Sequence, residues 1–336
     1  MQSHSPKISV LLAVYNGERY VKDATSSVLL QTFGDFELII IDDGSSDGTP
    51  KILNSFTDPR IVIVSNEKNE GLIKSLNKGI KMARGEYLAR MDADDISHPQ
   101  RFEKQINYME ANHGIGVLGT AVNHVDEKNK IISTLIQPQA HESILWKMFF
   151  ECAIIHPTVI ARKEVIEMAG GYDVRFPHIE DTELWMRVAD KTRFSNIPDV
   201  LHSHRLHKKS IGSTKSSVQY ESGLLLRKRF IASTIGVNMP PNVNKWFSEN
   251  ETILSGDDIA AGMGILLDIY EYILDLGFEN EESRLFVRND FLKKAAALMS
   301  ARKRRVSKTA VSLLKKILPS PLRHKLKTRF MKLAAK

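Results

Sequence analysis

Cysteine is almost absent from this 336-residue sequence. Cys152 is the only one, so no disulfide can form within the chain and a cysteine-rich zinc site is excluded. Hydrophobic runs are short as well: the N-terminal apolar stretch covers only residues 8–14, and no window reaches the roughly 18 apolar residues of a membrane-spanning helix. These absences predict a protein of a reducing compartment without a transmembrane helix, and we expect it in the cytoplasm.

Two common phosphate-binding motifs are also missing. The sequence contains no G-x-x-x-x-G-K-[ST], and no G-x-G-x-x-G follows the first apolar run, so neither a P-loop nor a dinucleotide site is supported. An EF-hand calcium loop beginning at Asp92 is excluded, because Ile96 occupies a ligand position and Ser97 the position of the glycine. A bound diphosphate would therefore need a metal ion as its counter-charge.

Acidic residues are absent from the end of the chain. Residues 293–336 contain 15 Lys and Arg but no Asp or Glu, whereas the rest of the chain holds 32 basic and 40 acidic residues. The net charge of +7 thus combines an acidic body with a strongly basic tail, and the two need separate explanations.

Strands and helices alternate in the first hundred residues. The apolar composition is 42%, enough for a sizeable core. Near-continuous apolar runs, typical of strands buried on both faces, lie at 8–14, 36–42, 60–66 and 85–92. Helical periodicity predicts helices at 18–31 and 70–83, with a short one ending near residue 56. This alternation predicts βαβ units and a parallel sheet.

Further elements follow Pro99. We predict a helix to residue 112, a hairpin over 115–136, a helix near 140–150, a strand over 157–162, a helix beginning at 180 and extended pieces over 193–207. From residue 216 onward the pattern is helical. The stretch 253–276 fits either a core helix or the interface of a homo-oligomer, and both alternatives stay open.

Polar clusters lie where three of the predicted strands end. They read "YNGE" (15–18), "DDGSSDG" (42–48) and "DADD" (92–95), and ligands of parallel sheets bind at the carboxyl ends of the strands. Crowded carboxylates repel one another, but Asp92 and Asp94 offer hard oxygen donors that suit Mg²⁺ or Mn²⁺. Further along, Asp181 in "EDTELW" either caps a helix or acts as a general base.

Three segments carry a family resemblance. In order they are "SVLLAVYNGERYVKDATSSVLLQTFGDFELIIIDDGSSDGT", "NEGLIKSLNKGIKMARGEYLARMDADD" and "GGYDVRFPHIEDTELWMR". Together they resemble the family 2 glycosyltransferases of GT-A fold, over about residues 7–210. The resemblance implies a mixed α/β sheet flanked by helices, as in nucleotide-diphospho-sugar transferases. It also implies that the domain at 1–215 divides into a donor half (1–98) and an acceptor half (99–215).

The resemblance implies roles for individual residues. Tyr15 matches the aromatic that lies against the nucleotide base, the backbone at Ala13 meets the base edge, and Asp43 hydrogen-bonds the base, usually uracil. Asp92 and Asp94 match the D-x-D motif, with the first near the ribose or sugar.

The other implied roles concern the metal and the proton transfer. Asp94 binds the metal, and His207 resembles a histidine that completes the metal shell in some relatives, although a surface histidine is an open alternative. Asp181 matches the catalytic base of inverting enzymes. A processive synthase is not supported, because the Q-x-x-R-W box is missing.

We therefore expect a Mn²⁺- or Mg²⁺-dependent inverting glycosyltransferase, of hexosyl- or N-acetylhexosaminyltransferase class, acting in bacterial surface polysaccharide biosynthesis. The donor would be a UDP-sugar and the acceptor a hydroxyl of a glycan or lipid-linked molecule. One alternative, a sugar-phosphate nucleotidyltransferase, would need a glycine-rich loop that "AVYNGERY" lacks. The other, a non-catalytic nucleotide- or metal-binding module, would have no use for Asp181.

The final segments complete the predicted organisation: a helical region at 216–292 and a basic amphipathic tail at 293–336. Such a tail is typical of binding to an anionic membrane surface, so we expect peripheral association with the inner face of the cell membrane. Packing on the protein itself or on a second subunit stays open. No nucleic-acid partner is expected, because no recognised module accompanies the tail and Phe330 is its only aromatic residue.

Overall fold

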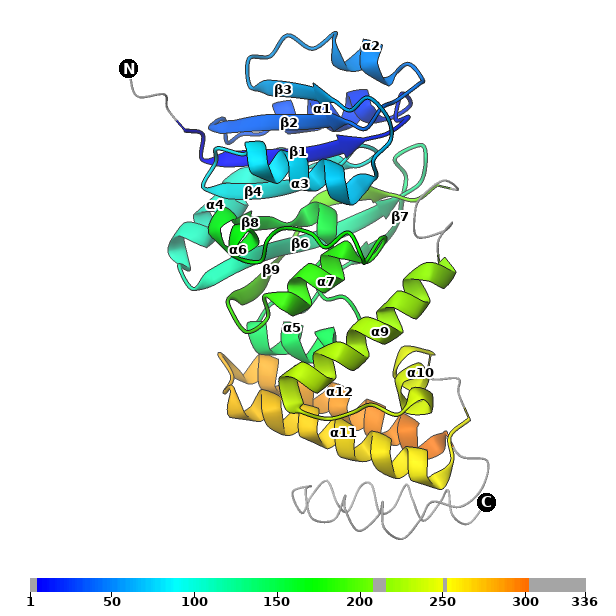
Figure 1. The fold of residues 1–336 in the computed structure, drawn as a ribbon. Coiled ribbons are helices and arrows are strands. Elements are labelled where there is room, and N and C mark those ends of the chain that lie inside the picture. Colours follow the sequence, from blue (N-terminus) through cyan, green and yellow to red (C-terminus); the bar gives the residue numbers. More distant parts are fainter. Residues whose placement is uncertain (1–4, 208–215, 250–252, 302–336) are drawn as a thin grey trace. The chain divides into compact units, whose positions relative to one another are not determined.

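The structure, a computed structural model, describes residues 5–207, 216–249 and 253–301 (Figure 1). The chain divides into a larger unit, Met1–Met148 with Cys152–Gly223, and a smaller unit, Phe149–Glu151 with Leu224–Lys336. The larger unit contains all the strands of the described residues, and the smaller unit is helical.

Four parallel strands begin the sheet, in the order β3-β2-β1-β4. They are β1 (Ile8–Val14), β2 (Phe36–Asp42), β3 (Ile61–Ser65) and β4 (Tyr87–Asp92). Every residue of β2 is buried, as the near-continuous apolar run predicts for a strand covered on both faces. The predicted parallel sheet is therefore confirmed.

The sheet continues as β8-β6-β9-β5, with β7 paired to β6 at the side. These strands are β5 (Ile96–Ser97), β6 (Ile115–Val125), β7 (Ile131–Leu135), β8 (Ile160–Arg162) and β9 (Arg193–Arg205). β8 is antiparallel to β4 and β6, whereas β9 is parallel to β6. The sheet is thus mixed, as expected.

Helices cover both faces of this sheet. α1 (Val21–Leu29), α2 (Thr49–Leu53) and α4 (Arg101–Ala111) contribute Val28, Leu53 and Phe102 to one core with β1, β2 and β4. α3 (Leu72–Met82) packs on the opposite face, where Gly79 lies against Leu11. α5 (His141–Met148), the 3-10 helix η1 (His156–Thr158), α6 (Lys163–Met168) and α7 (Glu180–Arg187) complete the unit.

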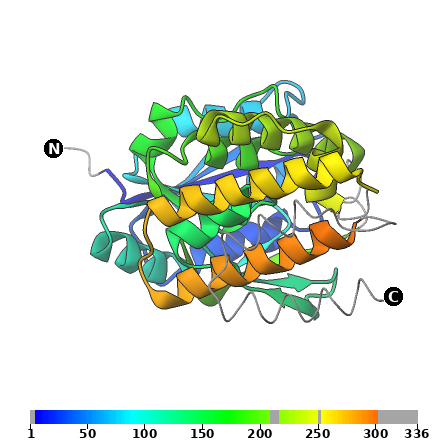
Figure 2. The ribbon, with the colours of Figure 1, turned by 90° about the horizontal axis from the view of Figure 1, so that it is seen from below.

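The smaller unit is built from helices, as the sequence predicts beyond residue 216. They are α9 (Ser216–Ile235), which begins in the larger unit, α10 (Pro241–Glu249), α11 (Gly256–Asp275) and α12 (Glu281–Ser300). α11 and α12 lie side by side as a helical hairpin (Figure 2). Tyr270 stacks on Phe291 with ring centroids 4.4 Å apart, so the predicted helix at 253–276 has core contacts within its own unit.

The basic tail is described only where it begins. Residues 293–300 form the last turns of α12, with Ala295, Leu298 and Met299 buried. The rest of the tail, 302–336, lies outside the described residues.

No helix in the described residues combines the length and apolar character needed to cross a bilayer.

Candidate active site

The three polar clusters meet at one edge of the sheet, as predicted. In the registers of β1 with its two neighbours, Val14 lies opposite Asp42 and Ala13 opposite Asp92. Because the strands are parallel, the loops that follow them leave the sheet together. The loop after β1, the loop after β2 and the turn after β4 therefore form a single candidate site.

The loops after β1 and β2 are joined by hydrogen bonds. The Asn16 amide donates to Ser45 Oγ at 2.9 Å, and the Ser46 amide donates to Asn16 Oδ1 at 2.8 Å. Tyr15 stands next to this network with 49% of its surface exposed. An exposed aromatic ring on a fixed loop is a suitable surface for stacking a nucleotide base.

Asp43 organises the loop that follows β3. Its Oδ1 accepts hydrogen bonds from Asn66 Nδ2 at 2.8 Å and the Glu70 amide at 2.9 Å, and its Oδ2 accepts from the Gly71 amide at 2.9 Å. The neighbouring Gly44 has φ +74°, and a Cβ there would lie 2.6 Å from the backbone of residue 68, so glycine is required. Since Oδ2 accepts a single bond from the described residues, it has capacity for a base N–H.

The DADD turn, residues 92–95, follows β4 and holds two partly exposed carboxylates. The side chains of Asp92 and Asp94 are 29% and 34% exposed. Asp92 forms an ion pair with the buried Arg90. Asp94 Oδ2 lies 2.8 Å from His207 Nε2, so the structure brings together the two residues predicted to bind the metal. Burial and then the charges of Asp92 and Asp95 raise the pKa of Asp94, against the opposing effect of His207.

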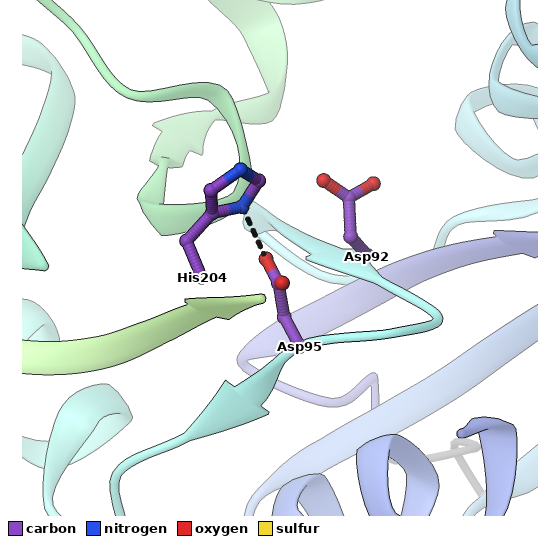
Figure 3. A group of neighbouring side chains, drawn as sticks. All are labelled: Asp92, Asp95 and His204. Atoms are coloured by element: carbon purple, nitrogen blue, oxygen red, sulfur yellow. Dashed lines mark hydrogen bonds and ion pairs between the residues drawn. The ribbon is translucent and has the colours of Figure 1, made fainter. Parts of the chain in front are cut away.

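A second group of ligand-type side chains consists of Asp92, Asp95 and His204 (Figure 3). Ligand atoms of Asp92, Asp95 and His204 lie within 4.8 Å of one another. Asp95 Oδ2 is 3.1 Å from His204 Nδ1. Burial opposes the charge of His204, but the bond to Asp95 and the surrounding carboxylates outweigh it and raise the His204 pKa to about 9. A protonated His204 thus supplies positive charge next to the crowded carboxylates.

The sequence interpretation missed Asp95 and His204 as members of the site. A signal for them existed: His202 and His204 are two residues apart in "HSHR", which puts both on one side of a strand. β5 pairs with β9 so that Ile96 lies opposite Ser203. Asp95, the residue before β5, therefore lies close to these histidines.

The donor atoms of this turn fit a divalent cation. Asp94 and His207 provide a carboxylate oxygen and an imidazole nitrogen in contact, and a further carboxylate, Asp92, lies close enough to raise the Asp94 pKa. Mixed carboxylate and imidazole sets suit Mn²⁺ and related ions, and carboxylates alone suit Mg²⁺. Excess negative charge at a partly exposed turn is also the electrostatic setting in which a cation binds.

The predicted base lies at the start of α7. The Thr182 amide donates to Asp181 Oδ1 at 2.7 Å. Burial raises the pKa of the half-buried Asp181, hydrogen bonds from Thr182 lower it, and the negative charge of Asp92 raises it further. Asp181 and the DADD turn therefore belong to one electrostatic site, although 88 residues separate Asp92 from Asp181 in the sequence.

The "GGYD" loop fixes the approach to α7. Gly170 and Gly171 both have positive φ, and a Cβ on Gly171 would lie 2.5 Å from Asn77 Oδ1. Asn77 in α3 accepts from the Tyr172 amide at 2.9 Å and donates to the Tyr172 carbonyl at 2.8 Å. Gly171 thus permits a close contact that ties the loop before α7 to α3.

Another hydrogen-bonded pair, near Asp181, was not predicted. His156 Nε2 lies 2.7 Å from the Tyr172 hydroxyl. Burial, and then the charge of Arg90, lower the pKa of His156, while burial raises the pKa of Tyr172 and the charges of Asp181 and Glu180 add to this. A neutral histidine and tyrosine therefore lie near the carboxylates of α7.

Solved structures share the architecture that holds this site. S. aureus TarS 1-349 in complex with UDP-GlcNAc is 18% identical, with a TM-score of 0.57 over 89% of this chain and 93% of that one. A mannosyltransferase from Pyrobaculum calidifontis, PcManGT, in complex with GDP-Man and Mn²⁺, is 17% identical, with a TM-score of 0.52 over 89% and 86% of the two chains. The fold is therefore the GT-A fold.

Sequence comparison gives the family. The family model described as glycosyl transferase family 2 matches residues 9–167. The O-antigen biosynthesis glycosyltransferase WbnJ of Escherichia coli is 35% identical over 63% of this chain and 84% of its own length. The beta-1,3-glucosyltransferase WfgD of E. coli, named for UDP-Glc and alpha-D-GlcNAc-diphosphoundecaprenol, is 30% identical over 62% and 80%. The chain belongs to glycosyltransferase family 2.

Proposed function

We propose that this glycosyltransferase is metal-dependent and inverting, and that it moves a hexosyl or N-acetylhexosaminyl group from a UDP-sugar to an acceptor hydroxyl. The observation that carries the proposal is the pair of hydrogen bonds between Asn77 in α3 and Tyr172, which ties the loop before α7 to the βαβ units that end in the DADD turn. The negative charge of Asp92, which raises the pKa of Asp181, supports a candidate base near the candidate diphosphate site. Displacement of a nucleoside diphosphate by a hydroxyl needs those two groups together.

Asp181 would accept the proton of the acceptor hydroxyl as the oxygen attacks the anomeric carbon. A carboxylate whose pKa is raised by burial is a stronger base than an exposed one. The Thr182 amide, 2.7 Å from Asp181 Oδ1, holds the carboxylate in one orientation. Attack from the face opposite the leaving diphosphate inverts the anomeric centre.

The remaining predicted residues would bind the donor. Tyr15 would stack on the base, the backbone at Ala13 would meet the base edge, and Asp43 Oδ2 would accept from the base. Asp92, oriented by Arg90, would lie near the ribose or the sugar.

Asp94 and His207 would hold Mn²⁺ or Mg²⁺. The bound ion would supply positive charge that stabilises the departing diphosphate. The Mn²⁺ in the PcManGT structure supports a divalent metal in this fold, and UDP-GlcNAc in the TarS structure supports a UDP-linked donor.

For the acceptor we propose a glycan or lipid-linked hydroxyl in bacterial surface polysaccharide assembly. The support is the resemblance to WbnJ, named for O-antigen biosynthesis, and to WfgD, named for a diphosphoundecaprenol acceptor. A cytoplasmic enzyme held at the inner face of the membrane by residues 293–336 would meet such an acceptor.

Asp181→Asn tests the proposed base. Asparagine keeps the shape and can still accept from the Thr182 amide, but it cannot take a proton. We expect the turnover number to fall by about 10²- to 10⁴-fold while UDP affinity in Mn²⁺ stays within about twofold, since Asp181 is not a predicted ligand of the nucleotide. Sugar transfer is measured with a panel of UDP-sugars, and UDP affinity by calorimetry.

The matched control is Asp190→Asn, an exposed aspartate beyond the end of α7, which should transfer at the wild-type rate. Near-wild-type transfer by Asp181→Asn would contradict the assignment of the base. Loss of UDP binding together with transfer would instead indicate that Asp181 supports the donor site.

A further inference from the structure

Arg101 is an arginine buried without an acidic partner. It begins α4 and has no exposed surface. Its Nε donates to Gln105 Oε1 at 3.0 Å, and its Nη2 donates to the carbonyls of Arg90 at 2.9 Å and Val159 at 3.2 Å. Among the described residues no carboxylate forms an ion pair with it. Burying a charge is costly unless its hydrogen bonds are satisfied. Neutral acceptors, and not a carboxylate in an ion pair, satisfy this guanidinium.

Another contact of Arg101 determines the tautomer of a buried histidine. Arg101 Nη1 lies 3.5 Å from Nδ1 of His202, which is 1% exposed. A guanidinium can only donate, so His202 Nδ1 is the acceptor and the ring proton is on Nε2. That Nε2–H donates to Asp95 Oδ2 at 2.7 Å. The order of contacts is therefore Arg101, His202, Asp95.

Both oxygens of Asp95 are engaged within the protein. Oδ2 accepts from His202 and His204, and Oδ1 accepts from the Arg205 amide at 2.8 Å. Asp95 is 1% exposed, in contrast to the partly exposed Asp92 and Asp94. Oδ2 already accepts two hydrogen bonds, so a cation could bind that oxygen only by displacing a histidine, and the burial of Asp95 restricts access to Oδ1.

A second contact holds the same turn. Arg205 Nε donates to the Asp94 carbonyl at 2.7 Å, and the Arg205 guanidinium lies 4.5 Å from the centroid of the Tyr20 ring. Tyr20 also lies against His207, with ring centroids 5.5 Å apart. Arg205, at the end of β9, therefore holds the DADD turn through two hydrogen bonds, one to the Asp94 carbonyl and one from its amide to the Asp95 carboxylate.

We propose that Arg101 and His202 are positioning residues which, through Asp95, fix the DADD turn against β9 and so present Asp92 and Asp94 to the diphosphate and its cation. Asp95 is then an anchor and not a metal ligand. The role given to Asp92 and Asp94 rests on the proposed function, whereas the fixing of the turn does not. The competing arrangement is a cation bound directly by Asp92, Asp95 and His204.

The first test uses the unaltered protein. Imidazole ¹⁵N resonances of histidine-labelled protein, recorded without metal, report which nitrogen of His202 carries the proton, and His202→Gln identifies its signals. We expect a neutral ring protonated at Nε2. Protonation at Nδ1 would overturn the proposal, because Arg101 would then have no acceptor on His202.

The second test compares His202→Leu with His202→Gln. Glutamine can place an amide N–H where the histidine has its Nε2–H, whereas leucine cannot donate. The control is His141→Leu. His141 is also buried, and it accepts a hydrogen bond at 3.1 Å from the amide of Phe194, which lies on β9 eight residues before His202. Amide hydrogen exchange of residues 92–98 and affinity for UDP with Mn²⁺ are measured well below each variant's unfolding temperature.

We expect leucine at position 202 to speed exchange of residues 92–98 and to weaken UDP binding in Mn²⁺ by about 10- to 100-fold. Glutamine should keep both close to wild type, and the control variant should alter neither. Unchanged exchange at 92–98 in His202→Leu, or equal losses in the leucine and glutamine variants, would overturn the proposal. If His202→Leu does not fold, the glutamine variant decides. Faster exchange or weaker UDP binding in His202→Gln would overturn the proposal. Wild-type behaviour of His202→Gln, together with an Nε2–H tautomer of His202 in the unaltered protein, would support the proposal. Failure of the wild-type protein to bind UDP with Mn²⁺ would count against the proposed function, while the exchange result would still decide the anchor.

Discussion

Three carboxylates within four residues have different surroundings at the DADD turn. Asp92 pairs with the buried Arg90, Asp94 lies 2.8 Å from His207, and Asp95 is enclosed by histidines. Burial raises the pKa of Asp95, but its bonds to His202 and His204 outweigh this and hold the pKa well below its usual range. Asp95 thus stays ionised, and its charge adds to the negative field at Asp94.

Removing the Asp94 carboxylate should remove the response of the site to metal. We expect Asp94→Ala to weaken UDP binding in Mn²⁺ by about tenfold or more, and to leave the weaker binding without metal unchanged. The reason is that Asp94 is the partly exposed carboxylate in contact with the candidate ligand His207. Calorimetric titration of UDP with Mn²⁺ and with a chelator measures both values.

The control for this substitution is Asp199→Ala. Asp199 is also partly exposed and pairs with Lys104 in α4, so its removal tests the loss of an aspartate away from the turn. An Asp94→Ala variant that still binds UDP more tightly when Mn²⁺ is added would refute the assignment.

At the residue level, sequence reasoning selected Asp92, Asp94 and Asp181 as candidate site residues because their motifs occur in a fixed order, and their roles stay predictions. It did not select the buried side chains that support the DADD turn. Arg101 and His202 were missed because a buried polar contact between a helix and a strand 101 residues apart leaves no periodic pattern in the sequence.

At the level of elements, α7 shows how a helix start can serve a site. Its first turn contains Glu180, Asp181 and Glu183, and carboxylates are favoured there by the helix dipole. Glu180 is nevertheless 5% exposed, and one of its oxygens has no hydrogen-bond partner in the described residues. Burial and the charge of Asp181 raise the pKa of Glu180 to about 7.

This raised pKa predicts a pH-dependent stability that Glu180→Gln should remove. A carboxyl whose pKa is higher in the folded state stabilises the fold below its unfolded value of about 4.3, and that stabilisation is lost as the pH rises through about 7. We expect the variant to gain stability over wild type between pH 5 and pH 8, by at most about 3 kcal/mol. Urea unfolding across this range measures the difference.

The control is Glu164→Gln, an exposed glutamate in the first turn of α6. It loses the same charge at a helix start without the burial. Parallel pH profiles for wild type and Glu180→Gln would show that Glu180 titrates normally.

The bounds of a strand or helix could be predicted where the apolar pattern of the sequence matches the burial of that element in the fold. β1 and β2 have the predicted bounds because both of their faces are buried, which the apolar runs encode. β9 was predicted as short extended pieces but forms one strand of 13 residues. Its register with β6 shifts between Ile197 and Val200, so a bulge accommodates Pro198 and Asp199, which interrupt the local signal. The two-residue β5 has no local signal and is defined by its pairing with β9.

At the level of the whole molecule, the helical unit has a core of its own. A capping box at Ser255 and Asp258 begins α11, and Val287, Phe291 and Leu298 of α12 are buried. The predicted tail at 293–336 therefore starts inside a packed helix. A truncation that probes the basic segment should end at Ala301, because an earlier end would remove part of this core.

A chain ending at Ala301 tests whether the basic segment binds membranes. We expect the full-length protein to float with vesicles that contain anionic lipid and to dissociate at high salt, since each Lys or Arg near an anionic surface contributes about 1 kcal/mol and salt screens the attraction. The truncated chain should stay with the unbound protein. Its UDP affinity should be unchanged, which would confirm that it is folded.

Neutral vesicles are the control. If the segment inserted by its apolar side chains without charge attraction, the full-length protein would float equally with neutral and with anionic vesicles. Equal flotation of the full-length and truncated chains would contradict a membrane role for residues 302–336. It would leave packing on the protein or on a second subunit, which the unfolding temperature and the oligomeric state of the two chains distinguish.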